Sequence, residues 1–487
     1  MTIRALATPW ASPGDRQFSL PTSLMVKLAL GETPERMPAL RDVARGVLPA
    51  ETSTGHQAVD RIIESHACGF RAARLFSAAA GQERGCGHVG YDSVEESLGM
   101  ARTLILRVPA GTPVGPLCEA LSQVTMVESA SPNYVAVTPF DVGGLIPHPP
   151  AGPNSGDAWA ARRMVRLAEA HAIEPGDDGV VVGLVDSGIR RDHHEFAHTF
   201  RAGYDTVRLE SGDIAAGVEL LGDHRRNDGN PEDPSVGHGM GCAGIIAADG
   251  NEMPRGLGGA CEIIPLRALA AAMLPNKTSA VGLGAISDLD MAMKLAVDLG
   301  AKLINMSFGT DDAALSPRSP RPHADVVDYA LARGCILIAA SGNNGRETRY
   351  WPAAYPGVIA VGAVGDDGRP TPFSTRGDHV ALCAPGEKVL TTALSGYQYA
   401  TGTSFAAPFV AGAAALLVAR SHRRARPIDA LTVRDILMRT AQPFAAGDSR
   451  GCGAGILDAA AALAALDKEI DSAMGDQAEA DGGADDG

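Results

Sequence analysis

The sequence predicts an α/β protein: a three-layer domain with a mostly parallel sheet, preceded by a small α+β domain. Two observations support this. From about residue 158 onward, almost uninterrupted apolar runs alternate with segments of helical spacing, which is typical of a parallel sheet covered on both faces. Upstream of a Pro- and Gly-rich stretch at 143–156, strand-like and helix-like segments alternate over a shorter length.

The small domain is expected over residues 22–140, after an irregular N-terminus at 1–21. Residues 23–30 alternate between apolar and polar side chains as a strand does, and two further runs are strand-like. The predicted strands are 23–30, 102–108 and 126–137, and the predicted helices are 59–69 and 113–124. Residues 141–157 are expected to form a linker.

The large domain is expected over residues 158–466. Its strand candidates are the short apolar runs 179–185, 263–266, 303–306, 335–339 and 358–364. Its helix candidates are 239–248, 288–299, 324–332, 404–420 and 432–440. Residues 467–487 are acidic and are expected to form a solvated, disordered tail.

Composition limits the partners. Hydrophobic residues make up 45% and charged residues 20% of the chain, as in a soluble globular protein. The net charge of -15 argues against nucleic acid. The most apolar stretch, 405–419, is too short to cross a bilayer and contains Pro408 and Gly412, so we expect a buried helix and no membrane partner.

Two further observations concern location. Residues 1–20 lack the apolar core of a secretory signal. The eight cysteines are dispersed without a Cys-x-x-Cys pair, which favours reduced, buried thiols over disulfides or a zinc site. Both favour a cytoplasmic location, and export by another route stays open.

Polar residues suited to catalysis follow several of the predicted strands. Asp186 ends a buried strand, where an ionised carboxylate needs hydrogen-bond donors, although a turn or a helix cap would use an Asp equally well. His238 opens a helix of small residues and could accept a proton from a hydroxyl, or simply begin the helix. Asn343 lies in a glycine-flanked turn and could direct its amide at an oxyanion, or serve as ordinary turn chemistry.

Ser404 lies in the first turn of the apolar helix expected at 404–420. Its backbone N–H has no intrahelical acceptor there, and the helix dipole adds positive charge, so this N–H is a second candidate oxyanion donor. Pro408 costs little at this place in a helix. A simple helix cap would explain the serine alone, but not the whole string Gly-Thr-Ser-Phe-Ala-Ala-Pro-Phe-Val-Ala-Gly at 402–412.

These four segments resemble the Asp, His, Asn and Ser signatures of the subtilisin-like (subtilase) serine peptidases, in that family's order. The resemblance covers roughly residues 158–466. It implies a serine endopeptidase in which Ser404 attacks the scissile carbonyl, His238 moves the proton and Asp186 orients the imidazole. It also implies that Asn343 holds the oxyanion, and that no cofactor is required for catalysis.

The resemblance further implies a binding site for a peptide or protein substrate. Ser307, Phe308 and Gly309 resemble the strand that pairs with the substrate backbone, and Ala340 and Gly342 would flank the pocket for the side chain before the cut. At one place the sequence departs from the family: Met240 and Gly241 replace the usual Thr-His after the His-Gly, which implies altered support for His238 and lower activity.

Two regions resemble accessory parts of the family. Asp228, Asn230 and Asp233 cluster oxygen ligands in one loop, as in calcium-binding relatives, although a solvated acidic loop explains them too. The small N-terminal domain resembles a propeptide, which implies a folding aid and inhibitor that is cut off between Thr138 and Asp157, whereas a permanent regulatory domain is the alternative.

Other functions have to be weighed against a self-processing peptidase. A catalytically silent scaffold could bind peptides through the same cleft, and a dedicated protease could mature one peptide or ligate its ends. A sedolisin-type acid peptidase is disfavoured, because His238 and Asn343 stand where that group uses carboxylates.

Overall fold

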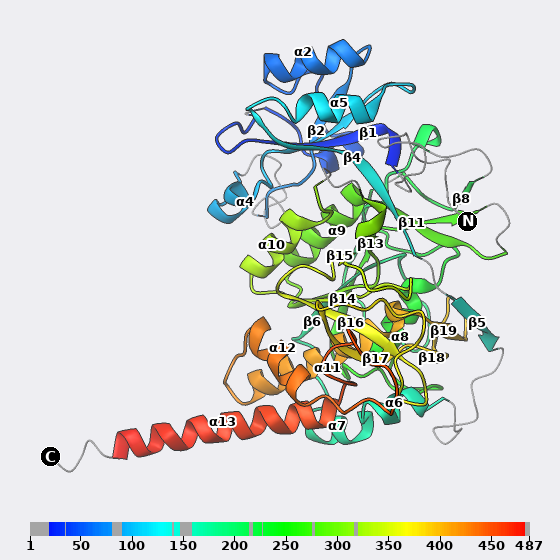
Figure 1. The fold of residues 1–487 in the computed structure, drawn as a ribbon, viewed down its shortest axis with the longest axis vertical. Coiled ribbons are helices and arrows are strands. Elements are labelled where there is room, and N and C mark those ends of the chain that lie inside the picture. Colours follow the sequence, from blue (N-terminus) through cyan, green and yellow to red (C-terminus); the bar gives the residue numbers. More distant parts are fainter. Residues whose placement is uncertain are drawn as a thin grey trace.

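The computed structural model describes residues 19–482 except positions 35, 80–89, 139–140, 147–157, 214–217, 226, 275–277 and 316–319. Its centre is a seven-stranded sheet in which every neighbouring pair is parallel (Figure 1). In spatial order the strands are β17 (Val380–Pro385), β16 (Val358–Val364), β14 (Ile336–Ala340), β12 (Leu303–Met306), β6 (Val181–Asp186), β9 (Glu262–Arg267) and β7 (Tyr204–Asp205).

Helices cover both faces of this sheet, because both faces are apolar. On β6, Val182 and Leu184 enter the core on one side, whereas Val181 and Val185 enter the core on the other. The first core includes α8 (His238–Ala247), α11 (Thr403–Arg423), α12 (Ala430–Arg439) and α13 (Ala459–Gly482). The second includes α9 (Ile286–Asp298) and α10 (Ala324–Ala332). The predicted three-layer α/β fold is confirmed.

Helix α11 extends beyond the apolar stretch 405–419 on both sides, so, contrary to the expectation from the sequence, it is long and apolar enough to cross a membrane, the one such helix among the described residues. Its most apolar window is 94% buried inside the protein, as expected for a core helix. Shorter helices α6 (Ala160–Met164) and α7 (Leu167–Ile173) lie at the start of this domain, and α7 contacts α13.

The N-terminal unit contributes four strands to a second seven-stranded sheet, and it lies above the parallel sheet in Figure 1. Its strands are β2 (Arg71–Arg74), β3 (Thr103–Arg107), β1 (Ser19–Leu28) and β4 (Val127–Val137), in that spatial order. Helices α2 (Gln57–His66) and α5 (Val114–Leu121) bury one face of these strands in a separate core. The short helices α1 (Leu40–Ala44) and α4 (Ser93–Leu98) complete this N-terminal unit.

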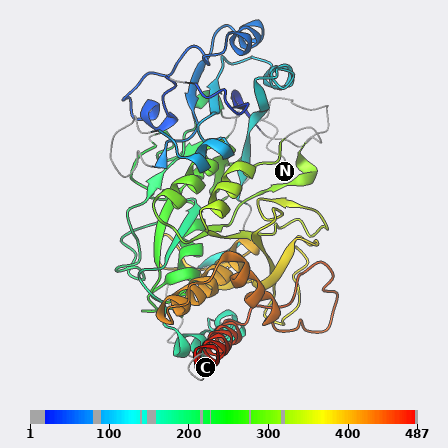
Figure 2. The same ribbon diagram turned by 90° about the vertical axis from the view of Figure 1, so that its left-hand side faces the viewer.

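The N-terminal unit packs on α9 and α10, as both ribbon views show (Figures 1 and 2). Ile105 and Tyr134 belong to the same apolar cluster as Met291 on α9. Ion pairs cross the boundary, with Lys27 Nζ 2.8 Å from Asp325 Oδ1 and Lys294 Nζ 2.7 Å from Glu95 Oε1. The unit is therefore joined to the larger domain by both apolar and charged contacts.

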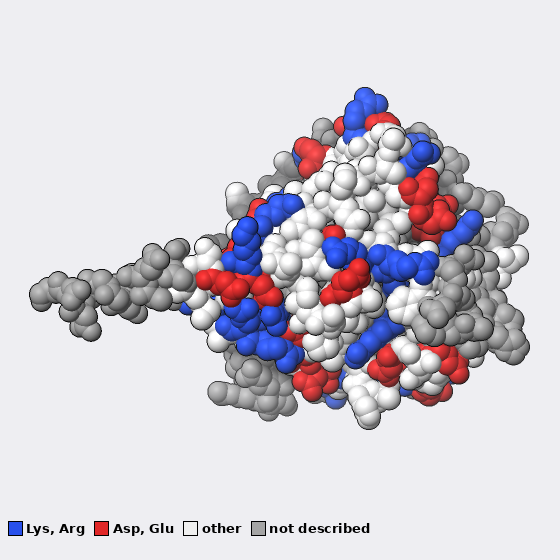
Figure 3. Space-filling model, turned by 90° about the horizontal axis from the view of Figure 1, so that it is seen from below, with Lys and Arg blue, Asp and Glu red and all other residues white. Residues whose placement is uncertain are grey.

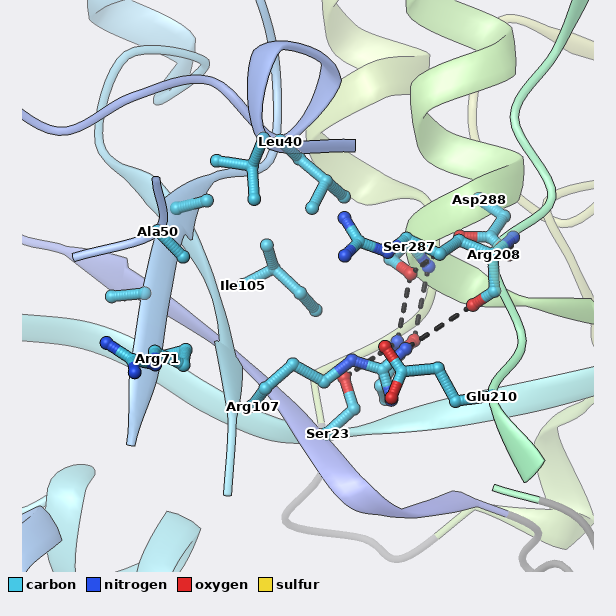
Figure 4. A pocket seen from close by; sticks show the side chains of 14 residues that line it. Ser23, Leu40, Ala50, Arg71, Ile105, Arg107, Arg208, Glu210, Ser287 and Asp288 are labelled. Atoms are coloured by element: carbon cyan, nitrogen blue, oxygen red, sulfur yellow. Dashed lines mark hydrogen bonds between the residues drawn. The ribbon is translucent and has the colours of Figure 1, made fainter. Parts of the chain in front are cut away.

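A cavity of about 230 Å³ remains at this boundary, and Figure 4 shows its walls. Leu40 and Ile105 of the N-terminal unit form an apolar side, while Arg208 and Asp288 of the larger domain lie opposite. Asp288 is buried, and its Oδ2 accepts a hydrogen bond from Arg208 N (3.0 Å). Burial raises the pKa of the Asp288 carboxyl to about 7.

Three further strands of the second seven-stranded sheet and two small sheets complete the described fold. Strand β4 continues the second seven-stranded sheet into the larger domain by pairing with β11 (Val281–Ala285), which is followed by β10 (Ala270–Met273) and β8 (Glu219–Leu221). Strands β18 (Val389–Thr392), β19 (Tyr397–Thr401) and β5 (Asp141–Ile146) form one sheet, and β13 (Thr310–Asp311) pairs with β15 (Tyr350–Trp351).

The structure corrects three boundaries. Residues 19–21 lie in β1 rather than in an irregular N-terminus, whose positions 1–18 lie outside the described residues. Residues 141–146 of the expected linker form β5, because β19 offers a paired edge, and 147–157 lie outside the described residues. The expected disordered tail is helical through 482, because residues 459–482 are rich in strong helix formers; 483–487 lie outside the described residues.

The surface and the cysteines agree with the composition. On the face seen in Figure 3, acidic and basic side chains are interspersed rather than gathered into one basic patch. Of the seven cysteines that the structure describes, all are free and all but Cys68 are buried. Reduced thiols therefore match the packing of these residues.

Candidate active site

Three residues predicted from the sequence meet at one end of the parallel sheet. Asp186 is the last residue of β6, His238 is the first of α8, and Ser404 is the second of α11. His238 Nδ1 lies 2.6 Å from Asp186 Oδ1, which also accepts a hydrogen bond from Ser187 N (2.7 Å). Because both side chains are buried, this contact is shielded from water and fixes the ring.

Ser404 is held at the end of β12 by a reciprocal pair of hydrogen bonds. Its Oγ donates to Ser307 O (3.1 Å), and Ser307 Oγ donates to Ser404 O (2.8 Å). Asn305 supports the pair by donating from Nδ2 to Ser307 Oγ (2.9 Å). The ring of Phe405, the next residue, lies 5.1 Å from the His238 ring, so α11 brings the serine beside the histidine.

Asn343 follows β14 and faces the start of α11. Its Oδ1 accepts hydrogen bonds from both the N and the Oγ1 of Thr403, each at 2.9 Å. With its oxygen engaged there, the amide directs Nδ2 to the other side, beside Gly402. A β-carbon at Gly402 would approach Nδ2 to 3.2 Å, so glycine leaves room for the amide. Nδ2 and Ser404 N are the two candidate oxyanion donors.

The departure at Met240 and Gly241 has a structural explanation. A β-carbon at Gly241 would lie 2.8 Å from the Phe405 ring, so glycine lets α8 pack closely against α11. The carbonyls of Met240 and Gly241 accept hydrogen bonds from the hydroxyls of Thr392 and Thr391, both at 2.6 Å. The threonines on β18 thus hold the first turn of α8, which carries His238, in place.

Asp233 has a different role from the calcium ligation predicted for it. Its two carboxylate oxygens accept hydrogen bonds from four donors: Ser235 N (3.0 Å), Val236 N (2.8 Å), Gly237 N (2.8 Å) and Ser187 Oγ (2.7 Å). Asp228 Oδ1 accepts from Asn230 N (2.8 Å) within its own turn. The four donors use both oxygens of Asp233, which therefore does not fit the calcium ligation predicted for it, whereas for Asp228 and Asn230 calcium binding stays a prediction. Asp233 instead shapes the loop that leads into His238.

A thiol lies beneath the histidine. Cys242 Sγ lies 4.0 Å from His238 Nδ1 and donates a hydrogen bond to Ser404 O (3.4 Å). Its burial and the neighbouring Asp186 raise the pKa of this thiol well above its usual value, so it stays protonated. It therefore serves as a small packing residue rather than as a nucleophile.

The predicted substrate residues lie at or just after the ends of β12 and β14. Gly309 and Gly342 follow β12 and β14 near Ser307 and Asn343, and Ala340 ends β14. Phe308 is buried, and its ring packs against that of His323 at 5.5 Å. Its side chain therefore belongs to the core.

Sequence reasoning missed two supporting residues. Ser187 donates through Oγ to Asp233 and accepts a hydrogen bond from Gly239 N (3.0 Å), so it joins the Asp and His segments. Thr403 positions Asn343. Both stand next to a predicted catalytic residue in the chain, which was the available signal.

Comparison with known proteins agrees with this architecture. The model of the subtilase family (Peptidase S8) matches residues 177–455. The chain therefore belongs to the subtilase family and is a serine endopeptidase by membership.

Individual relatives are similar over most of the larger domain. The chain is 32% identical over 314 residues to the thermophilic serine proteinase of Bacillus sp. (strain AK1), covering 63% of this chain and 67% of that one. It is 30% identical to thermitase of Thermoactinomyces vulgaris over 53% of this chain and 81% of that one. It spans 51% of the extracellular basic protease of Dichelobacter nodosus, at 30% identity.

Two solved structures are also similar. A protease from Pseudoalteromonas arctica matches with a TM-score of 0.54 and 26% identity, over 65% of this chain and 99% of that one. The prenylagaramide maturation protease PagA matches with a TM-score of 0.50 and 26% identity, over 62% of this chain and 98% of that one.

Proposed function

We propose that the protein hydrolyses peptide bonds through Ser404, His238 and Asp186, and that its first substrate is its own chain. The observation that carries the catalytic part is the buried 2.6 Å contact between His238 and Asp186 beside Ser404. This contact argues against a catalytically silent scaffold, because it holds the histidine in the tautomer that a general base requires.

The chemistry follows from this geometry. With Nδ1 donating to Asp186, Nε2 is the basic nitrogen of neutral His238 and takes the proton of Ser404 Oγ as the oxygen attacks the carbonyl carbon. Asn343 Nδ2 and Ser404 N stabilise the negative oxygen that forms. The protonated imidazole, stabilised by Asp186, then gives its proton to the leaving amine, and water hydrolyses the acyl-enzyme by the reverse sequence.

The strands on either side of residues 139–140 support self-processing. Strand β4 runs antiparallel to β11, with Ala136 opposite Gly284, and Thr138 N donates to Gly282 O (3.0 Å). Strand β11 begins beside the loop before His238, since Val236 and Ala280 share one buried cluster.

The following segment is held on another strand. Asp141, the first residue of β5, lies opposite Thr401 at the end of β19, three positions before Ser404. Only two residues join Thr138 to Asp141, and both flanking segments lie on strands that lead to the catalytic residues. We therefore place the self-cleavage between Thr138 and Asp141, which narrows the range expected from the sequence.

In this proposal the N-terminal unit remains an inhibitor after the cut, because β4 stays paired with β11 as an added strand. Its apolar contact with α9 and its ion pairs at Lys27 and Lys294 hold it in place. Peptide and protein substrates enter once it is released.

A fluorophosphonate probe, which reacts with activated serines, tests the proposed triad. Wild type is expected to be labelled at Ser404, and Ser404→Ala and His238→Ala are expected to lose labelling. Cys242→Ala serves as a matched control, because it removes the neighbouring thiol and leaves the triad. Unlabelled wild type that has lost its N-terminal unit would contradict the proposal.

A second candidate is a protease dedicated to maturing one peptide, which the similarity to PagA favours. Unfolded casein separates the two. Efficient hydrolysis of casein by the processed enzyme supports a general endopeptidase, whereas cleavage restricted to its own 138–141 segment supports the dedicated role.

A further inference from the structure

We propose that the ring of Tyr350 fills the pocket for the side chain that precedes the cut, so that the enzyme accepts only small residues such as glycine, alanine or serine there. The proposal rests on the proposed function and names its substrate class.

The position of this pocket follows from the catalytic residues. The attacked carbonyl has to lie between Ser404 Oγ and Asn343 Nδ2. Ser404 Oγ donates a hydrogen bond to the carbonyl of Ser307, which follows β12, and Asn343 follows β14. These two strands are neighbours, with Met306 opposite Ala339. The side chain next to the attacked carbonyl therefore extends into the space between residues 307–309 and residues 340–342.

Tyr350 lies in that space. A β-carbon at Gly309 would lie 2.5 Å from Cε1 and 2.8 Å from Cδ1 of the Tyr350 ring. A β-carbon at Gly342 would lie 2.9 Å from both Cδ2 and Cγ of the same ring. One edge of the ring therefore faces Gly309 and the other faces Gly342, so the ring stands between the two pocket walls.

The surrounding structure holds this ring in place. Tyr350 lies on β15, where it pairs with Asp311 on β13, two residues after Gly309. Asp311 also accepts hydrogen bonds from Asn344 Nδ2 (2.7 Å) and Thr348 Oγ1 (3.0 Å), which tie the segment between Asn343 and Tyr350 to β13. Burial raises the pKa of the Tyr350 hydroxyl, so it stays neutral. A ring fixed on paired strands excludes a large side chain instead of moving aside for it.

The expected selectivity is large. One additional methylene in a closed pocket changes specificity by about 10- to 200-fold, and a phenylalanine adds a whole ring. Replacing Tyr350 with glycine empties the space between Gly309 and Gly342. The glycine variant is therefore expected to accept large apolar residues that wild type rejects.

The test uses processed enzyme and three substrates, succinyl-Ala-Ala-Pro-X p-nitroanilide with X as alanine, leucine or phenylalanine. For wild type, kcat/KM is expected to be at least about 100-fold higher with alanine than with phenylalanine. Tyr350→Gly is expected to raise kcat/KM for phenylalanine at least about 100-fold. Tyr350→Phe is the matched control; it keeps the ring, so the wild-type ratio of alanine to phenylalanine is expected to persist.

The outcomes separate the pocket from the catalytic mechanism. If wild type hydrolyses the substrates with equal kcat/KM for alanine and phenylalanine, or with a higher value for phenylalanine, the proposed role of Tyr350 is wrong and the proposed triad is unaffected. The wild-type ratio decides this even if Tyr350→Gly does not fold. A changed ratio in Tyr350→Phe would show that the hydroxyl, not the ring, selects the substrate. Absence of hydrolysis of every substrate together with absence of fluorophosphonate labelling would overturn both proposals.

Discussion

Breaking the buried ion pair between Lys294 and Glu95 is expected to destabilise the whole chain. Lys294 Nζ lies 2.7 Å from Glu95 Oε1 and 2.8 Å from Asp298 Oδ2, and all three side chains are at most 3% exposed. Burial raises the pKa of the Asp298 carboxyl, while Lys294 opposes that shift. Lys294→Met therefore leaves two carboxylates buried without their cation. The expected cost is about 3–5 kcal/mol of unfolding free energy.

The assay is denaturant unfolding of the full chain in a Ser404→Ala background, which keeps the N-terminal unit attached. Lys302→Met is the control, since the Lys302 ammonium makes an exposed hydrogen bond to Gly334 O (3.0 Å), and it is expected to cost less than about 0.5 kcal/mol. Glu95→Leu alone is also expected to destabilise, because Lys294 then loses a partner. The double variant should lose less unfolding free energy than the sum of the two single variants, with a coupling energy of about 0.5–3 kcal/mol. Additive costs would refute the direct pairing across the boundary.

Three further outcomes are expected. Asn343→Ala should lower kcat about 10²- to 10³-fold with little change in KM, a magnitude known from subtilisin, a member of the same family. An unchanged kcat would show that Asn343 does not stabilise the oxyanion. Gly241→Ala should lower the free energy of unfolding by about 1–3 kcal/mol and also lower kcat, because its β-carbon would lie 2.8 Å from the Phe405 ring. Denaturant unfolding and peptide hydrolysis measure the two effects, and wild-type values in both would contradict the close packing. Burial raises the pKa of Asp288 to about 7, so between about pH 4 and 7 the folded chain keeps a proton that the unfolded chain releases, and the contribution of this group to stability falls as pH rises. Asp288→Asn should therefore gain stability relative to wild type as pH rises over that range, as measured by denaturant unfolding. A difference in unfolding free energy between the two proteins that does not change with pH would contradict the burial argument.

Much of the fold was predictable because the buried strands are almost purely apolar. The predicted bounds of β12 and β16 match those of the structure, because polar or turn-forming residues flank both apolar runs. Strand β17 was missed; it is a six-residue edge strand that ends in proline, a weak signal in isolation. Helix α13 was missed because its acidic residues suggested a solvated tail, whereas its alanines and leucines pack against the core up to Ile470.

The candidate catalytic residues could be proposed from the sequence because each lies in a local string of residues that the fold requires. Their surroundings could not, because these depend on contacts between distant segments. Asp233 has the chemistry of a metal ligand, yet three donors in its own loop and Ser187 after β6 use its oxygens. The ring of Tyr350 reaches Gly309 and Gly342 only after β13 and β15 pair. Sequence patterns therefore located the candidate site, whereas tertiary contacts determine which side chains surround it.

The intact mass of purified wild type beside Ser404→Ala tests the central claim most directly. We predict that wild type yields an N-terminal fragment that ends at Thr138, at 139 or at 140, whereas Ser404→Ala stays whole. An intact wild-type chain, or a fragment of the same mass in both proteins, would contradict self-processing by Ser404.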